Sequence, residues 1–149
     1  MSKALGSFGG FVACGSTTRD YLMNKSRSFI FSTALPPSAA ASAIASLQII
    51  RQIPETCERL RSNLRTLENA FKANGIGCNH FDTPIIPILF GDELNAMRVS
   101  HLLMEKGFFV PAIRPPSVPP ATSRLRVTIT AAHAEDEIVQ LAECLAAIL

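Results

Sequence analysis

The sequence predicts an α/β fold in two parts, on three observations. Across residues 55–74, apolar residues recur every three or four positions, which is the spacing of an amphipathic helix. From 85 to 149, short apolar runs alternate with helical stretches, which is typical of a small α+β domain. Residues 38–53 are rich in Ala and apolar on nearly every side, which indicates a buried helix. We therefore expect two domains, residues 1–53 and residues 54–149.

The elements of the first part are justified by apolar runs and prolines. Residues 8–14 form an apolar run broken by glycines and predict a buried strand. A short apolar cluster at 29–31 precedes Pro36 and Pro37. Because prolines are tolerated in a first helical turn, the helix over 38–53 is expected to begin directly after them.

The helix over 55–74 has the strongest pattern in the chain. Gly75 and Gly77 follow it and supply a helix end. Arg, Asn and Glu lie between its apolar positions, so we expect the apolar stripe to face a core rather than a cofactor. The stripe consists of Cys57, Leu60, Leu64, Leu67 and Phe71.

The second part continues as alternating strands and helices. Acidic residues open its last helix, where they complement the positive end of the helix dipole. The proline-rich segment 115–120 is expected to be a fixed extended loop. The predicted strands are 85–90, 108–113 and 124–130, and the predicted helices are 92–106 and 135–149.

The third strand combines periodicity with chemistry. Because strand side chains alternate, Leu125, Val127 and Ile129 are expected to face the core. Arg124 and Arg126 then face solvent or a cleft. A guanidinium held on a rigid strand suits a bidentate grip on a carboxylate, but a half-solvated strand also carries charges on its outer face as a rule. The alternation alone leaves both interpretations open.

Charge and composition exclude several classes of function. The formal net charge is only +2 at pH 7 with both signs scattered, so we expect no nucleic-acid partner and no anionic membrane partner. No apolar run approaches the roughly 18 residues that span a bilayer, and no leader pattern begins the chain. A cytoplasmic location is the resulting expectation.

The cysteines and histidines show no metal-binding spacing. The four cysteines lie far apart without a Cys-x-x-Cys pair, so we expect reduced, mostly buried thiols and no metal site. His80 and His101 likewise have no partners at ligand spacing. His133 precedes a predicted helix and is expected to cap or solvate it.

Lys3 is the best candidate catalytic group. It stands in the run Ser2-Lys3-Ala4-Leu5-Gly6. A neutral lysine amine forms a Schiff base with an aldehyde, and small neighbours let a bulky aldehyde cofactor approach. A Gly/Ser-rich run with a lysine is also typical of a solvated turn, so this run alone leaves both interpretations open.

Taken together, the run around Lys3 and three later segments closely resemble the α-oxoamine synthases, which depend on pyridoxal 5′-phosphate. The later segments are 31–37, 112–120 and 124–133. The resemblance extends from the first residue to the last in the family's order. It corresponds to only the C-terminal part of a much longer family chain.

The resemblance implies the C-terminal part of a fold-type I pyridoxal-phosphate transferase. Residues 1–53 would be a remnant of the large cofactor-binding domain. Residues 54–149 would be a connecting helix and the small C-terminal α+β domain. The full-length enzyme is expected to be a homodimer.

The resemblance also assigns roles to five side chains. Lys3 would carry the cofactor and then move the α-proton of the substrate as acid and base. Ser32 and Thr33 match a segment that reaches across the dimer interface to the cofactor phosphate, for which a hydroxyl donor is suitable. A capping role before the next helix remains the other interpretation for these two. Ser117 would contact substrate, unless it is simply a turn serine, and Arg126 would bind the amino-acid carboxylate.

The implied reaction joins an amino acid to an acyl thioester with decarboxylation. The run Ile113-Arg114-Pro115-Pro116 favours the branch of the family that condenses L-alanine with a pimeloyl thioester for biotin synthesis. The glycine acetyltransferase and aminolevulinate synthase types share this mechanism and remain alternatives.

Several family features have no match in the 149 residues. The aspartate that keeps the pyridine nitrogen protonated, the histidine that stacks on the ring and much of the phosphate cradle precede the lysine in the family. We therefore expect the 149 residues alone to be inactive and to associate through apolar surface. The alternative is a catalytically dead interaction module that binds a partner subunit through these faces.

Overall fold

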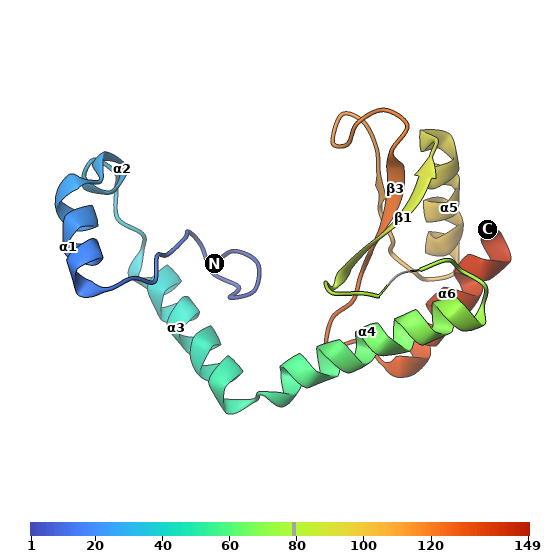
Figure 1. Cartoon of the computed structure of the whole chain (residues 1–149), viewed down its shortest axis with the longest axis horizontal. Coiled ribbons are helices and arrows are strands. Elements are labelled where there is room, and N and C mark those ends of the chain that lie inside the picture. Colours follow the sequence, from blue (N-terminus) through green and yellow to red (C-terminus); the bar gives the residue numbers. More distant parts are fainter. Residues whose placement is uncertain (79) are drawn as a thin grey trace. The chain divides into compact units, whose positions relative to one another are not determined.

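The computed structural model describes residues 1–78 and 80–149, which divide into two compact units (Figure 1). The first unit is Met1–Pro54 and the second is Glu55–Leu149. The first unit contains α1 (Ser16–Lys25), α2 (Arg27–Ile30) and α3 (Pro37–Gln52). The second unit contains α4 (Glu55–Ala73), β1 (Ile85–Gly91), α5 (Glu93–Glu105), β2 (Ala112–Ile113), β3 (Ser123–Thr128) and α6 (Glu135–Ile148).

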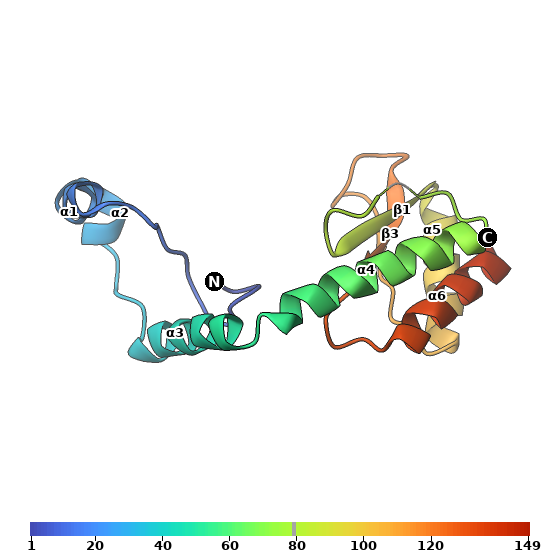
Figure 2. The same ribbon diagram turned by 60° about the horizontal axis from the view of Figure 1, so that its bottom comes forward.

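The second unit is built on a three-stranded antiparallel sheet in the order β1-β3-β2. The central strand β3 pairs with β1 so that Arg126 lies opposite Pro87, and with β2 so that Leu125 lies opposite Ala112. α4 and α6 run side by side in both views of this unit (Figures 1 and 2). Burial alternates along β3, so one face of the sheet meets the core and the other is open.

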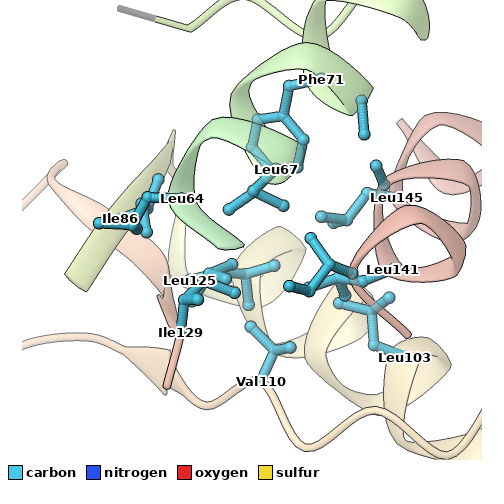
Figure 3. Packing of buried hydrophobic residues seen from close by; sticks show 14 of the residues in the cluster. Leu64, Leu67, Phe71, Ile86, Leu103, Val110, Leu125, Ile129, Leu141 and Leu145 are labelled. Atoms are coloured by element: carbon cyan, nitrogen blue, oxygen red, sulfur yellow. The ribbon is translucent and has the colours of Figure 1, made fainter. Parts of the chain in front are cut away.

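The hydrophobic core of this unit lies between the sheet and the three helices (Figure 3). Phe71 on α4 stacks edge-to-face on Phe81, with ring centroids 5.9 Å apart. α5 begins at an Asp92 cap, whose carboxylate accepts from the Asn95 backbone N–H at 2.8 Å. The largest fully buried side chains are Phe71, Leu67, Leu103, Leu125, Ile138, Leu145, Val99 and Val127.

Most expected elements of this unit are confirmed, with three corrections. α4, α5, β1, β3 and α6 lie within one or two residues of the expected positions. The strand expected over 108–113 is reduced to Ala112–Ile113, since only these residues pair with β3. The loop 115–120 is not extended, because Ser117 N–H donates to the Arg114 carbonyl at 3.0 Å and closes a turn.

The third correction concerns the cysteines, which were expected to be mostly buried. Cys14 and Cys57 are exposed, and Cys78 and Cys144 are half-buried. The expected apolar stripe of α4 therefore begins at Leu60 rather than at Cys57, because the first turn of the helix extends beyond the core. All four thiols are free.

The first unit has much less buried apolar surface. Leu5, Ala39 and Ala43 are its buried apolar residues in the described structure. The expected strand at residues 8–14 is wrong, because a strand exists only by pairing and no partner strand lies in this unit. α3 forms as expected but is not buried, since Ile44, for example, is 57% exposed.

A polar cluster fixes the chain after α4. Lys72 Nζ donates to Glu68 Oε1 at 2.5 Å, and His80 Nδ1 lies 2.9 Å from Glu68 Oε2. The hydrogen bond from Lys72, and then that from His80, lower the pKa of Glu68. The Glu68 carboxylate in turn raises the pKa of Lys72. Cys78 Sγ adds a weak bond to the Glu68 backbone carbonyl at 3.8 Å.

Replacing Leu67 by Ala is expected to lower the free energy of unfolding by about 2–5 kcal/mol, because its side chain is fully buried and the change leaves a cavity. Leu94 is a matched control on α5, since it is 71% exposed. Leu94→Ala should change stability by at most about 0.5 kcal/mol. Equilibrium denaturation of the three proteins measures both, and equal losses would contradict the core described above.

Glu68→Gln is expected to remove a pH-dependent part of the stability. The contribution of Glu68 is present above the ordinary carboxyl pKa of 4.5 and is lost as pH falls through the lowered pKa. Lys72 also contributes stability, but its contribution is lost only as pH rises above 10.5 through the raised pKa. Denaturation midpoints should therefore separate wild type from variant at neutral pH and converge in acid.

The control for this measurement is Glu143→Gln, at an exposed position of α6. It should leave the acid limb of the stability curve as in wild type. A gap between wild type and Glu68→Gln that is the same at neutral and acid pH would contradict the role of the carboxylate.

Candidate functional site

Lys3 lies in a tight hydrogen-bonded turn. Gly6 N–H donates to the Lys3 carbonyl at 3.3 Å, and Gly6 has φ +53°, a conformation that favours glycine. The side chain of Lys3 is exposed, whereas Leu5, the bulky residue of the run, is buried in the unit. The turn therefore directs its apolar side chain inward and its amine outward.

Two hydroxyls of α3 hold the turn that carries Lys3. Ser46 Oγ donates to the Leu5 carbonyl at 2.8 Å, and Ser42 Oγ donates to the Gly6 carbonyl at 3.3 Å. These bonds join residues that are 41 and 36 positions apart. The backbone of the turn is therefore fixed by side chains of a distant helix.

The residues after the turn also pack within the first unit. Ser7 Oγ donates to the Ala39 carbonyl of α3 at 2.6 Å. Gly9 has φ +88°, and a Cβ at this position would lie 2.7 Å from Leu35 Cδ1. The close approach at Gly9 and the bond from Ser7 place the start of the chain against α3 and the loop before it.

Ser32 and Thr33 lie in the loop between α2 and α3, and both are exposed. In the described structure, α3 begins at Pro37, and no side chain makes a capping hydrogen bond at its N-cap residue, Pro36. The capping role that the sequence left open for these hydroxyls is therefore not observed. Both hydroxyls remain available to a ligand or partner.

Arg126 projects from the open face of the sheet. Its backbone N–H donates to the Pro111 carbonyl at 3.0 Å, and its strand neighbour on β1 is Pro87. Its side chain is exposed, while Leu125 and Val127 on either side are buried. The strand is thus fixed by its core face, and the guanidinium is presented on the other.

Arg124 and Ser117 differ from Arg126 in their surroundings. Arg124 Nε donates to the Thr122 carbonyl at 2.9 Å, which fits a structural role. Ser117 is exposed in the turn closed by its own N–H and the Arg114 carbonyl. Its hydroxyl is therefore accessible on the loop between β2 and β3.

The five candidate side chains divide between the two units. Lys3, Ser32 and Thr33 belong to the first, and Ser117 and Arg126 to the second. Lys3, Ser32 and Thr33 make no side-chain hydrogen bond to one another within the described first unit, and Ser117 and Arg126 make none to each other within the second. Each unit therefore presents its own candidate groups at its surface.

The hydrogen bonds from Ser42 and Ser46 to the turn that carries Lys3 were not predicted from the sequence. Their only signal in the sequence is a pair of serines four positions apart in an Ala-rich helix. His133 does not cap α6, whose N-cap is Ala134, and its Nδ1 instead accepts from Thr130 N–H at 3.2 Å in the turn before the helix. The ring thus helps to close that turn.

Residues 1–78 and 80–149 show neither a metal-binding cluster nor a membrane-spanning helix. These residues contain no group of three or more His, Cys, Asp or Glu arranged to hold a metal ion. In the same range, no helix has the length and apolar character needed to cross a bilayer.

Comparison with known proteins identifies the family. The family described as aminotransferase class I and II matches residues 1–145. The chain belongs to this family. It is 45% identical over 138 residues to a putative 8-amino-7-oxononanoate synthase of Desulforudis audaxviator, covering 93% of this chain and 36% of that protein. It is 42% identical over 146 residues to the 8-amino-7-oxononanoate synthase of Methylococcus capsulatus, covering 98% of this chain and 38% of that protein.

A solved structure agrees with this family. Serine palmitoyltransferase from S. paucimobilis, determined with a bound PLP-myriocin aldimine, superposes with a TM-score of 0.85 at 31% identity. The match covers 99% of this chain and 37% of that one. The fold is therefore that of part of a fold-type I pyridoxal-phosphate enzyme, as expected from the sequence. The chain spans about 36–38% of the length of these relatives.

Proposed function

We propose that this chain forms part of a pyridoxal-phosphate-dependent acyltransferase that condenses L-alanine with a pimeloyl thioester, with decarboxylation, to 8-amino-7-oxononanoate in biotin synthesis. The observation that carries the proposal is the 45% identity, over 93% of the chain, to a relative bearing the name of that enzyme. Further support comes from the amine of Lys3 and the guanidinium of Arg126, which are both presented outward.

The residues around Lys3 fit the cofactor. Ser2, Ala4 and Gly6 are small, and Leu5 is turned inward, so bulky side chains of this run do not crowd the amine. Ser32 and Thr33 supply exposed hydroxyls, which in a homodimer would serve the cofactor site of the partner subunit. A primary amine for the aldehyde and hydroxyl donors for the phosphate are the groups that pyridoxal phosphate requires.

Pyridoxal phosphate, when bound, supplies an electron sink for negative charge at the α-carbon of an amino acid. Lys3 would hold the cofactor through its amine, and its Nζ would take and return the α-proton of the substrate. Arg126 binds the amino-acid carboxylate with its guanidinium and so fixes the orientation of the α-carbon. Ser117 donates its hydroxyl to substrate from the loop between β2 and β3.

The remaining assignments are proposed on the same basis. The first unit is the remnant of a large cofactor-binding domain, and the second is a connecting helix with the small C-terminal domain. The complete enzyme is a cytoplasmic homodimer, in which Ser32 and Thr33 reach the cofactor phosphate across the subunit interface.

The decisive experiment locates the cofactor lysine. The full polypeptide that carries these residues is incubated with pyridoxal phosphate and reduced with borohydride, and the labelled peptide is mapped by mass spectrometry. The label is expected on Lys3, because its amine is presented from a fixed turn. Lys3→Arg should abolish the label, while the control Lys25→Arg should retain it. A label on Lys25, Lys72 or Lys106 in the wild type would overturn the proposal.

Arg126→Ala is expected to weaken binding of L-alanine by about 2–5 kcal/mol, because a charged partner of the carboxylate is lost. Stability should change little, since the side chain is exposed. The Michaelis constant for L-alanine and the denaturation midpoint measure the two effects. Arg98→Ala, at an exposed position of α5, is the matched control. An unchanged Michaelis constant in folded Arg126→Ala would return this arginine to an ordinary surface role.

A further inference from the structure

We propose that Ser42 and Ser46 of α3 are positioning residues for Lys3. Their hydroxyls bind the carbonyls of Gly6 and Leu5 and so fix the turn from which the amine projects. The inference rests on the proposed function, because a fixed amine matters only if Lys3 carries the cofactor.

The contacts form one continuous stripe along α3. Positions 39, 42, 43 and 46 follow the i, i+3, i+4, i+7 spacing that places side chains on one face of a helix. Ala39 and Ala43 are buried, and their small side chains let another segment approach the helix closely. Ser42 and Ser46 then supply donors at that approach. The stripe is therefore a docking face for residues 5–7.

The hydroxyls are used in an unusual way for a helix. Serine in a helix interior commonly bonds back to its own backbone one turn earlier, which weakens the helix. Here both serines donate to residues 36 and 41 positions away. Alanine would be the better helix former at both positions. Serine at these two positions therefore lowers the helix propensity of α3 but supplies hydrogen-bond donors to the turn that carries Lys3.

The bonds from Ser42 and Ser46 act directly on the carbonyls of Leu5 and Gly6, whereas the other polar contacts of the turn involve its flanks, such as the bond from Ser7 Oγ to the Ala39 carbonyl at 2.6 Å. Lys3 is exposed, and the contact between Gly6 N–H and the Lys3 carbonyl is long at 3.3 Å. Leu5 contributes the buried apolar side chain of the run. A lysine that must meet a carbonyl carbon and later a proton on the α-carbon requires a fixed approach. Loosening the turn should therefore reduce the reactivity of the amine more than the stability of the chain.

The test uses the full polypeptide with pyridoxal phosphate and the variants Ser42→Ala, Ser46→Ala and the double variant. Two readouts address the turn: hydrogen exchange at the Gly6 and Ser7 amides, and the fraction of Lys3 trapped by borohydride at limiting cofactor. In the double variant, exchange should rise and trapping should fall roughly tenfold, the size expected for losing two hydrogen bonds. kcat should fall with the Michaelis constant for L-alanine unchanged, because Arg126 is untouched.

Two further variants separate positioning from general damage. Ser46→Thr keeps the hydroxyl and should restore exchange and trapping toward wild type. Ser38→Ala, at an exposed position of the same helix, should behave as wild type. If the double variant does not fold, the two single alanine variants are judged by the same measurements, with about half the effect on a logarithmic scale.

Wild-type exchange and trapping in folded alanine variants would overturn the positioning role. The positioning role would also be overturned if Ser46→Thr failed to restore exchange and trapping while Ser38→Ala was as impaired as the alanine variants. A wild-type protein labelled at another lysine would instead overturn the proposed function. Labelling of Lys3 in wild type is therefore the result that tells the two failures apart.

Discussion

The alternation of side chains along β3 is the constraint on which the second unit depends. Leu125 and Val127 are almost fully buried and close the core beneath α4 and α6. The same backbone pairs with β1 on one side and β2 on the other, so its register also sets theirs. Because the period is two, fixing Leu125 and Val127 inside also fixes Arg126 outside. A slip of one residue would exchange the core for the charged face, which makes the position of the guanidinium a consequence of folding.

The first unit is held by a different balance of forces. Its buried apolar residues are few and mostly alanine, so burial contributes less per element than in the second unit. Side-chain hydroxyls bound to backbone carbonyls make up part of the difference, as in the bonds from Ser7, Ser42 and Ser46. Each such bond has a small net free energy, so it stabilises a local geometry better than a whole domain. The main effect of such a bond is therefore geometric, because it fixes the position of one turn.

The sequence was informative wherever one periodicity dominated. The repeat at Leu60, Leu64 and Leu67 gave α4, and the alternation in β3 gave both faces of the sheet. The expected strand at residues 8–14 failed because an apolar run records burial but not its partner, and a strand requires one. The serine contacts to Leu5 and Gly6 could not be read from the sequence, since a hydroxyl does not reveal which distant carbonyl it will bind. Local patterns therefore predict elements well and long-range polar contacts poorly.

The candidate chemical groups are separated from the groups that maintain the fold. Lys3, Ser117 and Arg126 have exposed side chains, while the residues beside them, such as Leu5 and Leu125, are buried. The backbone around each group is fixed by neighbours, so the group itself need not contribute to packing. Since an exposed side chain contributes little to the free energy of unfolding, loss of the chemistry and loss of the fold are separable by substitution. The opposite holds for Leu5, whose loss would affect the turn and the chemistry together.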